Sequence, residues 1–236
     1  MSSRWVTGAP ARNSVGHTMT ATARRGPVPP PGMRRAPVQA RSAQRVGVLL
    51  DTTAALVDEG GLHAVTTKRV ADRSGMSIGS VYRFFPDGLS LLRALAARNR
   101  DHYMRRIDTL LRAAPPAAVP ELVDAAVDEL VAMHRHEPGF RALRFGDVID
   151  GSLTDVHGSE GPFAAGVRDL LVRYTGTRQA PLLASQVRTA AAMCDGIIAA
   201  AFTMDRSGDA WMIDRCKTLL RGYVGDCVAD AGAASA

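Results

Sequence analysis

The sequence predicts an all-α protein. Its apolar residues are mostly alanine, leucine and valine, with only 5% aromatic residues, a composition that favours helices over strands. These apolar residues recur at a helical period in about nine segments, and no segment has the alternation of a convincing strand. With 236 residues, 46% of them hydrophobic, the chain has room for one small and one larger domain.

The first 38 residues differ from the rest. They contain no acidic residue, arginine pairs at 24–25 and 34–35 lie among prolines, and no regular period is present. Such a segment buries too little apolar surface to offset its ordering entropy, so we expect residues 1–38 to be disordered. Two interpretations stay open. One is a basic arm that lies along DNA. The other is a solvated tail, part of which, up to residue 32, need not be translated, since Met19 and Met33 are also candidate starts.

Helical periodicity begins at Gln39. Apolar or small residues recur on one face of this first helix: Val46, Leu49, Leu50, Thr53, Ala54 and Val57. Gly60 and Gly61 follow and are expected to end it, because glycine adopts the left-handed conformation of many helix ends.

Two short helices complete the first domain, which we place at residues 39–87. The hydroxyl of Thr66 is suited to cap a helix that runs to about Ser74. Ser77 is suited to cap the next helix, which is expected to end by Phe85 because Pro86 follows.

Residues 88–230 are predicted to form a second, helical domain, followed by a disordered tail at 231–236. The predicted helices cover residues 89–111, 120–138, 140–149, 162–174, 182–202 and 210–228. A loop rich in Gly, Ser and Asp separates the third and fourth of these.

The stretch from Val65 to Leu92 has the pattern of a helix, a tight turn and a second helix. An apolar set is expected to hold the two helices together across the turn: Val70, Ala71, Met76, Val81 and Phe85. This is the architecture of a helix-turn-helix, whose second helix enters the major groove of DNA.

Eight outward residues are candidate DNA contacts: Thr66, Thr67, Lys68, Ile78, Gly79, Ser80, Tyr82 and Arg83. The hydroxyls of Ser80 and Tyr82 can bond phosphate oxygens, and Arg83 can bind a phosphate or the O6/N7 edge of guanine. Gly79 permits a close backbone approach. The start of the first helix, which also carries Arg69, suits a phosphate. On these residues alone, a charged and solvated helical hairpin remains the alternative.

The pattern V-T-T-x-x-V-A-x-x-S-G-M-S-x-G-S-V-Y-x-F-F-P-D resembles the tetracycline-repressor (TetR) family of bacterial transcription regulators, over about residues 43–92. The resemblance implies a three-helix DNA-binding domain followed by an all-α ligand-binding and dimerisation domain. It places the family's DNA contacts on the same eight residues. One position departs from the family: Gly88 stands where a phosphate-binding lysine is usual. That contact is either missing or supplied by Arg93 or the basic tail.

The resemblance also implies a ligand pocket and a homodimer through the last two helices. Helix 182–202 is apolar nearly all round, which predicts burial on more than one side, and its small residues suit close packing in a four-helix bundle with 210–228 of both subunits. A core helix of a monomer is the alternative. Candidate pocket residues are Met133, His134, Phe140, Phe145, Phe163, Met193 and Phe202. Few charges lie among them, which favours an apolar or weakly polar effector.

Other functional classes are disfavoured. Residues 75–79 fit the G-x-S-x-G nucleophile motif of hydrolases, and Asp155 and His157 follow in the required order, but that motif works only on a strand-to-helix turn. We therefore expect no enzyme. No glycine-rich loop predicts a cofactor, and His134 and His136 lie on different helix faces, so no metal pair is expected.

Charge and cysteine content point to a cytoplasmic DNA-binding protein. Residues 1–100 carry 15 basic and 5 acidic residues, whereas residues 101–236 carry 14 and 18, which indicates a polyanion partner for the first part. Three cysteines without metal spacing are typical of reduced cytoplasmic thiols. No apolar run reaches the roughly 18 residues of a membrane span, so no membrane is expected.

Together these features predict a ligand-responsive DNA-binding transcriptional regulator. We expect a repressor that binds a palindromic operator as a dimer and is released by a small molecule. The alternative is a non-specific or architectural DNA-binding protein. The basic tail favours that alternative, and the large apolar second half, which DNA binding does not require, disfavours it.

Overall fold

The computed structural model describes residues 33, 40–143, 161–177 and 183–233. In these residues the chain is all α, as predicted, with no strand. The helices are α1 (Ala40–Gly60), α2 (Thr67–Ser74), α3 (Ile78–Phe84), α4 (Gly88–Ala113), α5 (Val119–His136), α6 (Pro162–Thr175), α7 (Leu183–Met204) and α8 (Ala210–Ala233), with short 3₁₀ helices η1 (Leu62–Ala64) and η2 (Phe140–Ala142).

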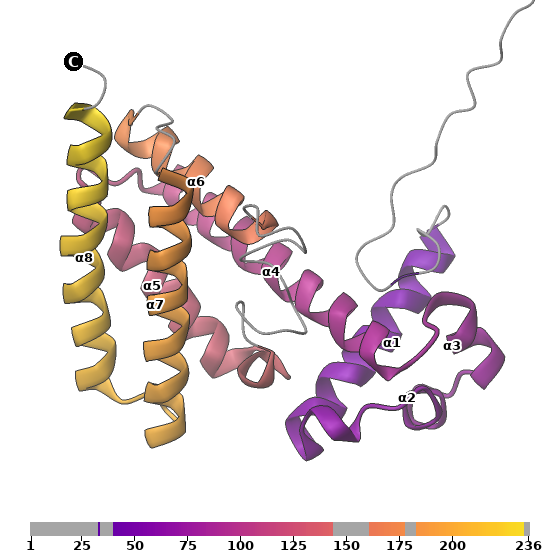
Figure 1. The fold of residues 1–236 in the computed structure, drawn as a ribbon. Coiled ribbons are helices and arrows are strands. Elements are labelled where there is room, and N and C mark those ends of the chain that lie inside the picture. The colour runs from indigo at the N-terminus through magenta and orange to yellow at the C-terminus, as the bar shows by residue number, and fades with distance from the viewer. Residues whose placement is uncertain (1–32, 34–39, 144–160, 178–182, 234–236) are drawn as a thin grey trace, which may run out of the picture.

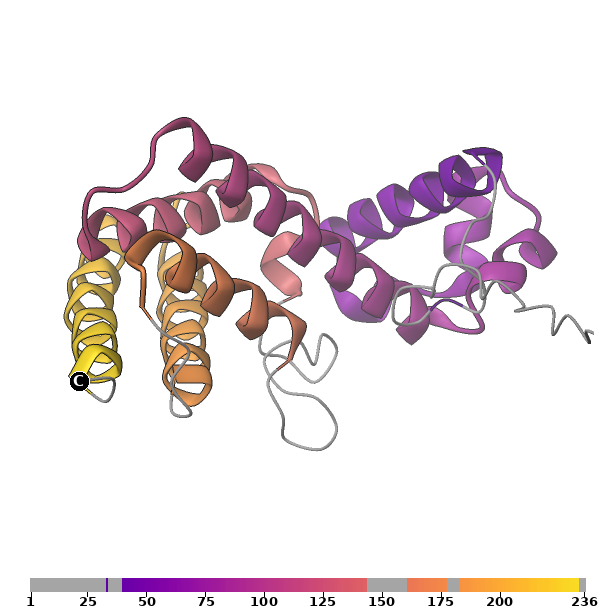
Figure 2. The same cartoon turned by 90° about the horizontal axis from the view of Figure 1, so that it is seen from above.

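The helices form two groups joined by α4 (Figure 1). We call α1 to α3, with the first turns of α4, the head, and the remainder of α4 with α5 to α8 the body. Figure 2 shows α4 running from the body into the head. Each group has its own apolar cluster, and the cluster of the head includes Leu91 and Leu95 of α4. The first turns of α4 therefore complete the core of the head.

Capping residues set the helix ends in the head. The Thr66 hydroxyl accepts a hydrogen bond from the Arg69 backbone N–H (3.1 Å), and the Ser77 hydroxyl accepts one from the Ser80 N–H (3.3 Å). Between them, Gly75 ends α2 with φ of 68°, a left-handed conformation that glycine adopts without strain. The predicted short helices and the turn between them are confirmed.

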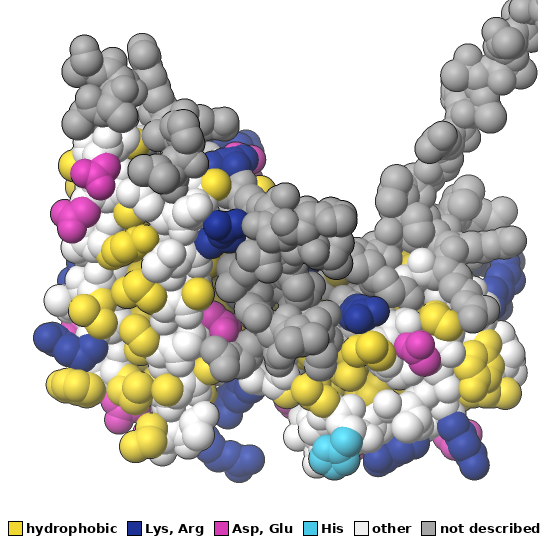
Figure 3. All heavy atoms as spheres, viewed as in Figure 1, with side chains coloured by type: hydrophobic (Ala, Val, Ile, Leu, Met, Phe, Trp, Pro, Cys, Tyr) yellow, Lys and Arg dark blue, Asp and Glu magenta, His cyan; other side chains and the backbone are white. Residues whose placement is uncertain are grey.

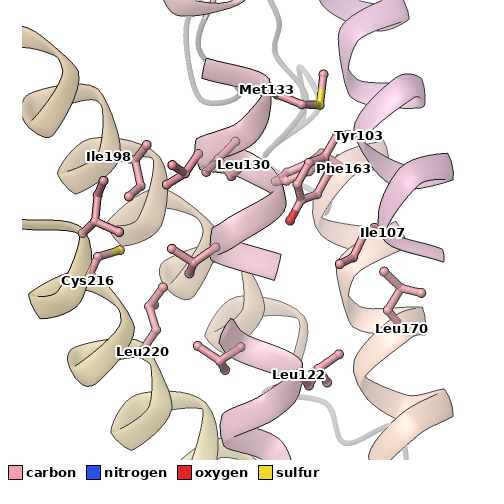
Figure 4. Close-up of a cluster of buried hydrophobic side chains, with 14 of the residues drawn as sticks. Tyr103, Ile107, Leu122, Leu130, Met133, Phe163, Leu170, Ile198, Cys216 and Leu220 are labelled. Carbon is pink, nitrogen blue, oxygen red and sulfur yellow. The ribbon is translucent and has the colours of Figure 1, made fainter. Parts of the chain in front are cut away.

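The body packs its helices around α5. The cluster includes Ile107 of α4, Leu130 of α5, Leu170 of α6, Ile198 of α7 and Leu220 of α8. Figure 4 shows these side chains pointing into the space between the helices. α5 thus contacts the other long helices of the body and ends close to the head.

The helix predicted over residues 140–149 is corrected at its start. The chain forms a 3₁₀ turn at Phe140–Ala142 rather than the start of an α-helix. Gly139 is left-handed and the Phe140 N–H donates to the Glu137 carbonyl, so no α-helical register begins there. Residues 144–149 lie outside the described residues, so eight α-helices rather than nine are seen in the described chain.

The last helix is longer than predicted, because α8 continues to Ala233, into the segment expected to be disordered. Alanine-rich sequence favours continued helix here. Residues 234–236, the loop at 151–160 and, apart from Met33, the predicted tail at 1–38 lie outside the described residues. Met33 is half buried against the apolar cluster of the head.

Helix α7 is less enclosed than its sequence suggested. Six of its residues are buried, and the opposite side of the helix is only partly covered within the single chain. It is also long and apolar enough to cross a membrane by length and composition alone, a property that core helices of soluble proteins share. In this structure α7 packs against α6 and α8.

Candidate functional site

Helix α3 presents one face to the head and the other to solvent. Val81 and Phe84 are buried, whereas Ile78 and Tyr82 are 42% and 45% exposed, unusually high for side chains of this size. Gly79 and Arg83 are also exposed, and Ser80 is half buried. The five candidate DNA contacts predicted on this helix therefore lie at or near one solvent-facing surface.

A hydrogen bond links the start of α2 to this surface. Thr66 and Lys68 are exposed, but Thr67 is buried and its hydroxyl donates to the phenol oxygen of Tyr82 at 3.3 Å. Thr67 therefore orients Tyr82 rather than offering its own side chain to solvent. The predicted set is brought together in space, with this one member in a supporting position.

The basic residues of the head differ in whether they are already engaged in ion pairs or could contact DNA phosphates. Arg73 forms a two-pronged ion pair with Glu59 of α1, and this hydrogen bond holds the pKa of Glu59 below its usual value. Lys68, Arg69 and Arg83, by contrast, form no ion pair with another described residue. Arg69 lies beside Lys68 on α2 and is exposed, as suits the phosphate contact expected at this helix start, although it is not one of the eight predicted DNA contacts.

The body contains an apolar cavity of about 110 Å³, lined by α4, α5, α6, α7 and α8. Tyr103 and Phe163 both line it, and their rings pack against one another with centroids 5.7 Å apart. Figure 4 shows the two side chains close together. Phe163 is the predicted pocket residue that lines this cavity. Tyr103, Gln186 and Asp195 also line it and were not predicted.

Most of the other predicted pocket residues form a separate aromatic cluster. The His134 ring stacks on Phe202 and meets Phe140 edge-on, each with centroids 4.9 Å apart. Its Nδ1 lies 2.9 Å from the Leu130 carbonyl oxygen, and the Arg141 guanidinium covers the Phe202 ring at 5.0 Å. The side chains of His134, Phe140 and Phe202 are buried in the core and do not line the cavity.

Of the three remaining pocket candidates, two do not line the cavity and one cannot be placed. Met133 is fully buried and Met193 is half buried against the core, and neither lines the cavity. Phe145 lies outside the described residues. Helical periodicity identifies inward-facing residues but does not separate a cavity wall from a filled core.

The arrangement does not support hydrolase chemistry. Gly75 ends α2 and Ser77 begins α3, so the G-x-S-x-G sequence spans a helix-helix turn rather than a strand-to-helix turn. Asp155 and His157 lie outside the described residues. Among the residues that are described, no group of three or more His, Cys, Asp or Glu side chains could hold a metal ion.

Comparison with known proteins assigns both parts of the chain. The sequence model for bacterial regulatory proteins of the tetR family matches residues 49–95, and the model for tetracyclin repressor-like C-terminal domains matches residues 117–225. A TetR-family transcriptional regulator from Streptomyces coelicolor is 33% identical in sequence, with a TM-score of 0.68 over 78% of this chain and 99% of that one. The chain belongs to the TetR family.

Two curated relatives are transcriptional repressors by name. KstR of Rhodococcus jostii is 29% identical over 112 residues, 45% of this chain and 51% of that protein. KstR of Mycobacterium tuberculosis is 33% identical over 113 residues, 45% of this chain and 50% of that protein. The chain thus spans about half the length of the curated relatives it matches. TetR-family proteins are DNA-binding transcription factors and not enzymes.

The departure from the TetR pattern at Gly88 has a structural cause. A Cβ atom at this position would lie 2.5 Å from the backbone oxygen of Val65, which is closer than real Cβ atoms approach. The start of α4 is packed directly against the chain that enters α2, so the backbone leaves no room for a side chain at 88. Arg93, the predicted substitute for the phosphate contact, is exposed on α4.

Proposed function

We propose that this TetR-family protein is a ligand-responsive transcriptional repressor that binds a palindromic operator as a homodimer. The solvent-facing side of α3 is the observation that carries the proposal. Two large apolar side chains, Ile78 and Tyr82, are held outward there beside Arg83, on a helix too short to be stable without its packing against the head. Such a surface suits insertion into a major groove.

Base readout is proposed for the outer side of α3, and phosphate binding for the start of α2. Arg83 can make two hydrogen bonds to guanine, and Ile78 can contact a thymine methyl group. Lys68, Arg69 and the hydroxyl of Thr66 supply phosphate contacts around it. Thr67 acts through Tyr82, to which it is hydrogen-bonded.

Dimerisation is proposed through α7 and α8. Figure 3 shows hydrophobic side chains gathered over these two helices on one face of the molecule. Trp211 and Leu219 of α8 are 71% and 53% exposed, and Met204 at the end of α7 is 75% exposed. A second copy that covers them with its own α7 and α8 would form a four-helix bundle. Two heads would then lie about 34–36 Å apart, one turn of DNA.

Release by a small molecule is proposed to act through α4. This helix contributes Leu91 and Leu95 to the core of the head, and Tyr103 and Ile107 to the wall of the cavity. A ligand that binds one arrangement of α4 more tightly than another shifts the spacing of the two heads, and thereby operator affinity. The cytoplasm, where the DNA and reduced thiols are found, is the proposed location.

Selection from a pool of genomic DNA fragments tests this proposal. The purified protein is mixed with the pool at about 0.15 M salt, and the retained fragments are sequenced. Enrichment of one palindrome is the expected result. Retention without sequence preference would instead favour an architectural DNA-binding protein, and no retention with or without added ligand would contradict DNA binding.

A further inference from the structure

Two of the three cysteines lie at the same level of neighbouring helices. Cys194 belongs to α7 and Cys216 to α8, and these two helices pack side by side. The Asp209 N–H donates to the Ala201 carbonyl at 3.1 Å, so these two positions mark one level across the turn that joins the helices. Each cysteine lies seven residues from this contact, along its own helix. Seven residues are nearly two helical turns, or about 10.5 Å, so the cysteines are level with one another and on the facing sides of the helices.

The side chains of this pair are in contact. A hydrogen bond joins the two thiols, which lowers the pKa of Cys216 and, together with burial, raises the pKa of Cys194. Cys216 is fully buried, and Figure 4 shows its side chain pointing from α8 into the core. Cys194 packs against the same core. The pair therefore shares its protons, and the S–H of one cysteine stabilises a thiolate on the other, which is the reactive form.

The pair is reached from the apolar cavity. Cys194 lines the cavity, whereas Cys216 does not. Leucine, valine, alanine, isoleucine and phenylalanine side chains supply most of the remaining wall. Such a wall concentrates small apolar molecules from water, because their apolar surface is removed from the solvent. An apolar molecule that enters the cavity therefore meets one sulfur atom of the pair.

The third cysteine shares the cavity but not the contact. Cys227 also lines the cavity, and its thiol is hydrogen-bonded to Tyr223. It lies eleven residues beyond Cys216 on α8, about 16 Å at the rise of an α-helix, so it cannot join the pair. Cys227 therefore provides a cysteine with the same access to the cavity and no second thiol beside it.

We propose that Cys194 and Cys216 form an oxidation site for apolar organic hydroperoxides, which enter the cavity and convert the two thiols into a disulfide between α7 and α8. The site is a property of the body and does not rest on the proposed function. Its failure would leave the proposed DNA binding untouched, because the oxidation is measured without DNA.

The reaction has two steps. In the first, the Cys194 thiolate attacks the outer oxygen of the hydroperoxide and the O–O bond breaks. Cys194 becomes a sulfenic acid, and the alkoxide leaves and takes a proton from water to become an alcohol. In the second, the Cys216 thiol attacks the Cys194 sulfur, the S–O bond breaks, and the hydroxyl group leaves with the thiol proton as water. Two thiols are thereby oxidised to one disulfide, and one hydroperoxide is reduced to an alcohol and water.

Two oxidants test the proposal on the unaltered full-length protein. The reduced protein is mixed at pH 7 with cumene hydroperoxide or, at the same concentration, with hydrogen peroxide, and the free thiols are counted after unfolding. We expect the count to fall from three to one. We also expect cumene hydroperoxide to react at least about tenfold faster, because its aromatic ring favours the apolar cavity. Equal or faster reaction of hydrogen peroxide would overturn the route through the cavity, and an unchanged thiol count would overturn the site.

Peptide mapping without reductant identifies the bond. Mass spectrometry should find the peptide of Cys194 joined to that of Cys216, and dithiothreitol should separate them. Cys227→Ser should form the same cross-link, whereas Cys194→Ser and Cys216→Ser should form none. Oxidation of the unaltered protein without this cross-linked peptide, or oxidation confined to Cys227, would overturn the proposal.

Discussion

The backbone N–H of Gly139 donates a hydrogen bond to Oδ1 of Asp58, with a distance of 2.7 Å. Asp58 belongs to α1 of the head, and Gly139 follows the end of α5 in the body. A Cβ at Gly139 would lie 3.1 Å from the backbone of Ala54, so α1 and this turn are in direct contact. The head is therefore held to the body at a second place besides α4, at the end of a helix that lines the cavity.

Replacing Asp58 tests this connection. Asp58→Ala leaves the buried Gly139 N–H without its acceptor, so we expect the free energy of unfolding to fall by about 1–2 kcal/mol. The measurement is urea denaturation, with the exposed Asp72→Ala as control. An unchanged midpoint for Asp58→Ala would show that the hydrogen bond does not stabilise the junction.

Because Gly88 lies so close to the Val65 backbone, even its replacement by alanine should destabilise the protein. Gly88→Ala places a methyl group against the Val65 carbonyl, so α4 or the chain before α2 must shift. We expect this shift to lower the free energy of unfolding by about 1–3 kcal/mol. Gly47→Ala on α1 is the control, because a Cβ there meets nothing within 4 Å. Thermal unfolding should show a lower Tm for the first variant only. Equal Tm values would contradict the packing at Gly88.

If the exposed apolar side of α8 forms the dimer interface, a charged side chain placed there should prevent dimerisation. Leu219→Glu would bury a carboxylate in the proposed dimer interface, so we expect monomers by analytical ultracentrifugation where the unaltered chain is dimeric. Leu110→Glu, at a 40% exposed leucine of α4, should leave the dimer intact. A dimeric Leu219→Glu protein would exclude this face of α8 from the interface.

The proposed base contact of Arg83 predicts that replacing this residue weakens binding to the operator more than binding to random DNA. If Arg83 reads a base, Arg83→Ala should cost about 1–3 kcal/mol on the selected operator and less on random DNA. Equal losses would make Arg83 a phosphate contact. Fluorescence anisotropy on both DNAs measures this, with Arg112→Ala at the far end of α4 as the charge control. No loss on either DNA would remove Arg83 from the interface.

The head could be predicted closely from sequence because its signals are local. Thr66, Gly75 and Ser77 fix helix ends through bonds to neighbours one turn away or less, and the structure places each as expected. The close contact between Gly88 and Val65 could not be predicted, because it depends on how α4 packs against a segment more than twenty positions earlier in the chain.

The cavity was harder to predict for a related reason. Met133 and Leu130 have the same helical signature, yet Leu130 lines the cavity and Met133 does not. Which buried side chains leave a space depends on the angles between five helices, which periodicity does not encode. A usable signal was present in Asp195, the one acidic residue of α7, because a buried carboxyl group marks a polar position within the core.

Gly79 gives the most direct test that α3 enters the DNA groove. A Cβ at Gly79 or at Gly47 meets nothing within 4 Å, so alanine at either helical position should leave the fold intact and raise stability by about 0.5–1 kcal/mol. Only Gly79 lies on the proposed DNA-facing side. The decisive measurement is the operator affinity of both variants: we predict at least a tenfold loss for Gly79→Ala and none for Gly47→Ala, whereas unaltered affinity in Gly79→Ala would contradict close approach of α3 to DNA.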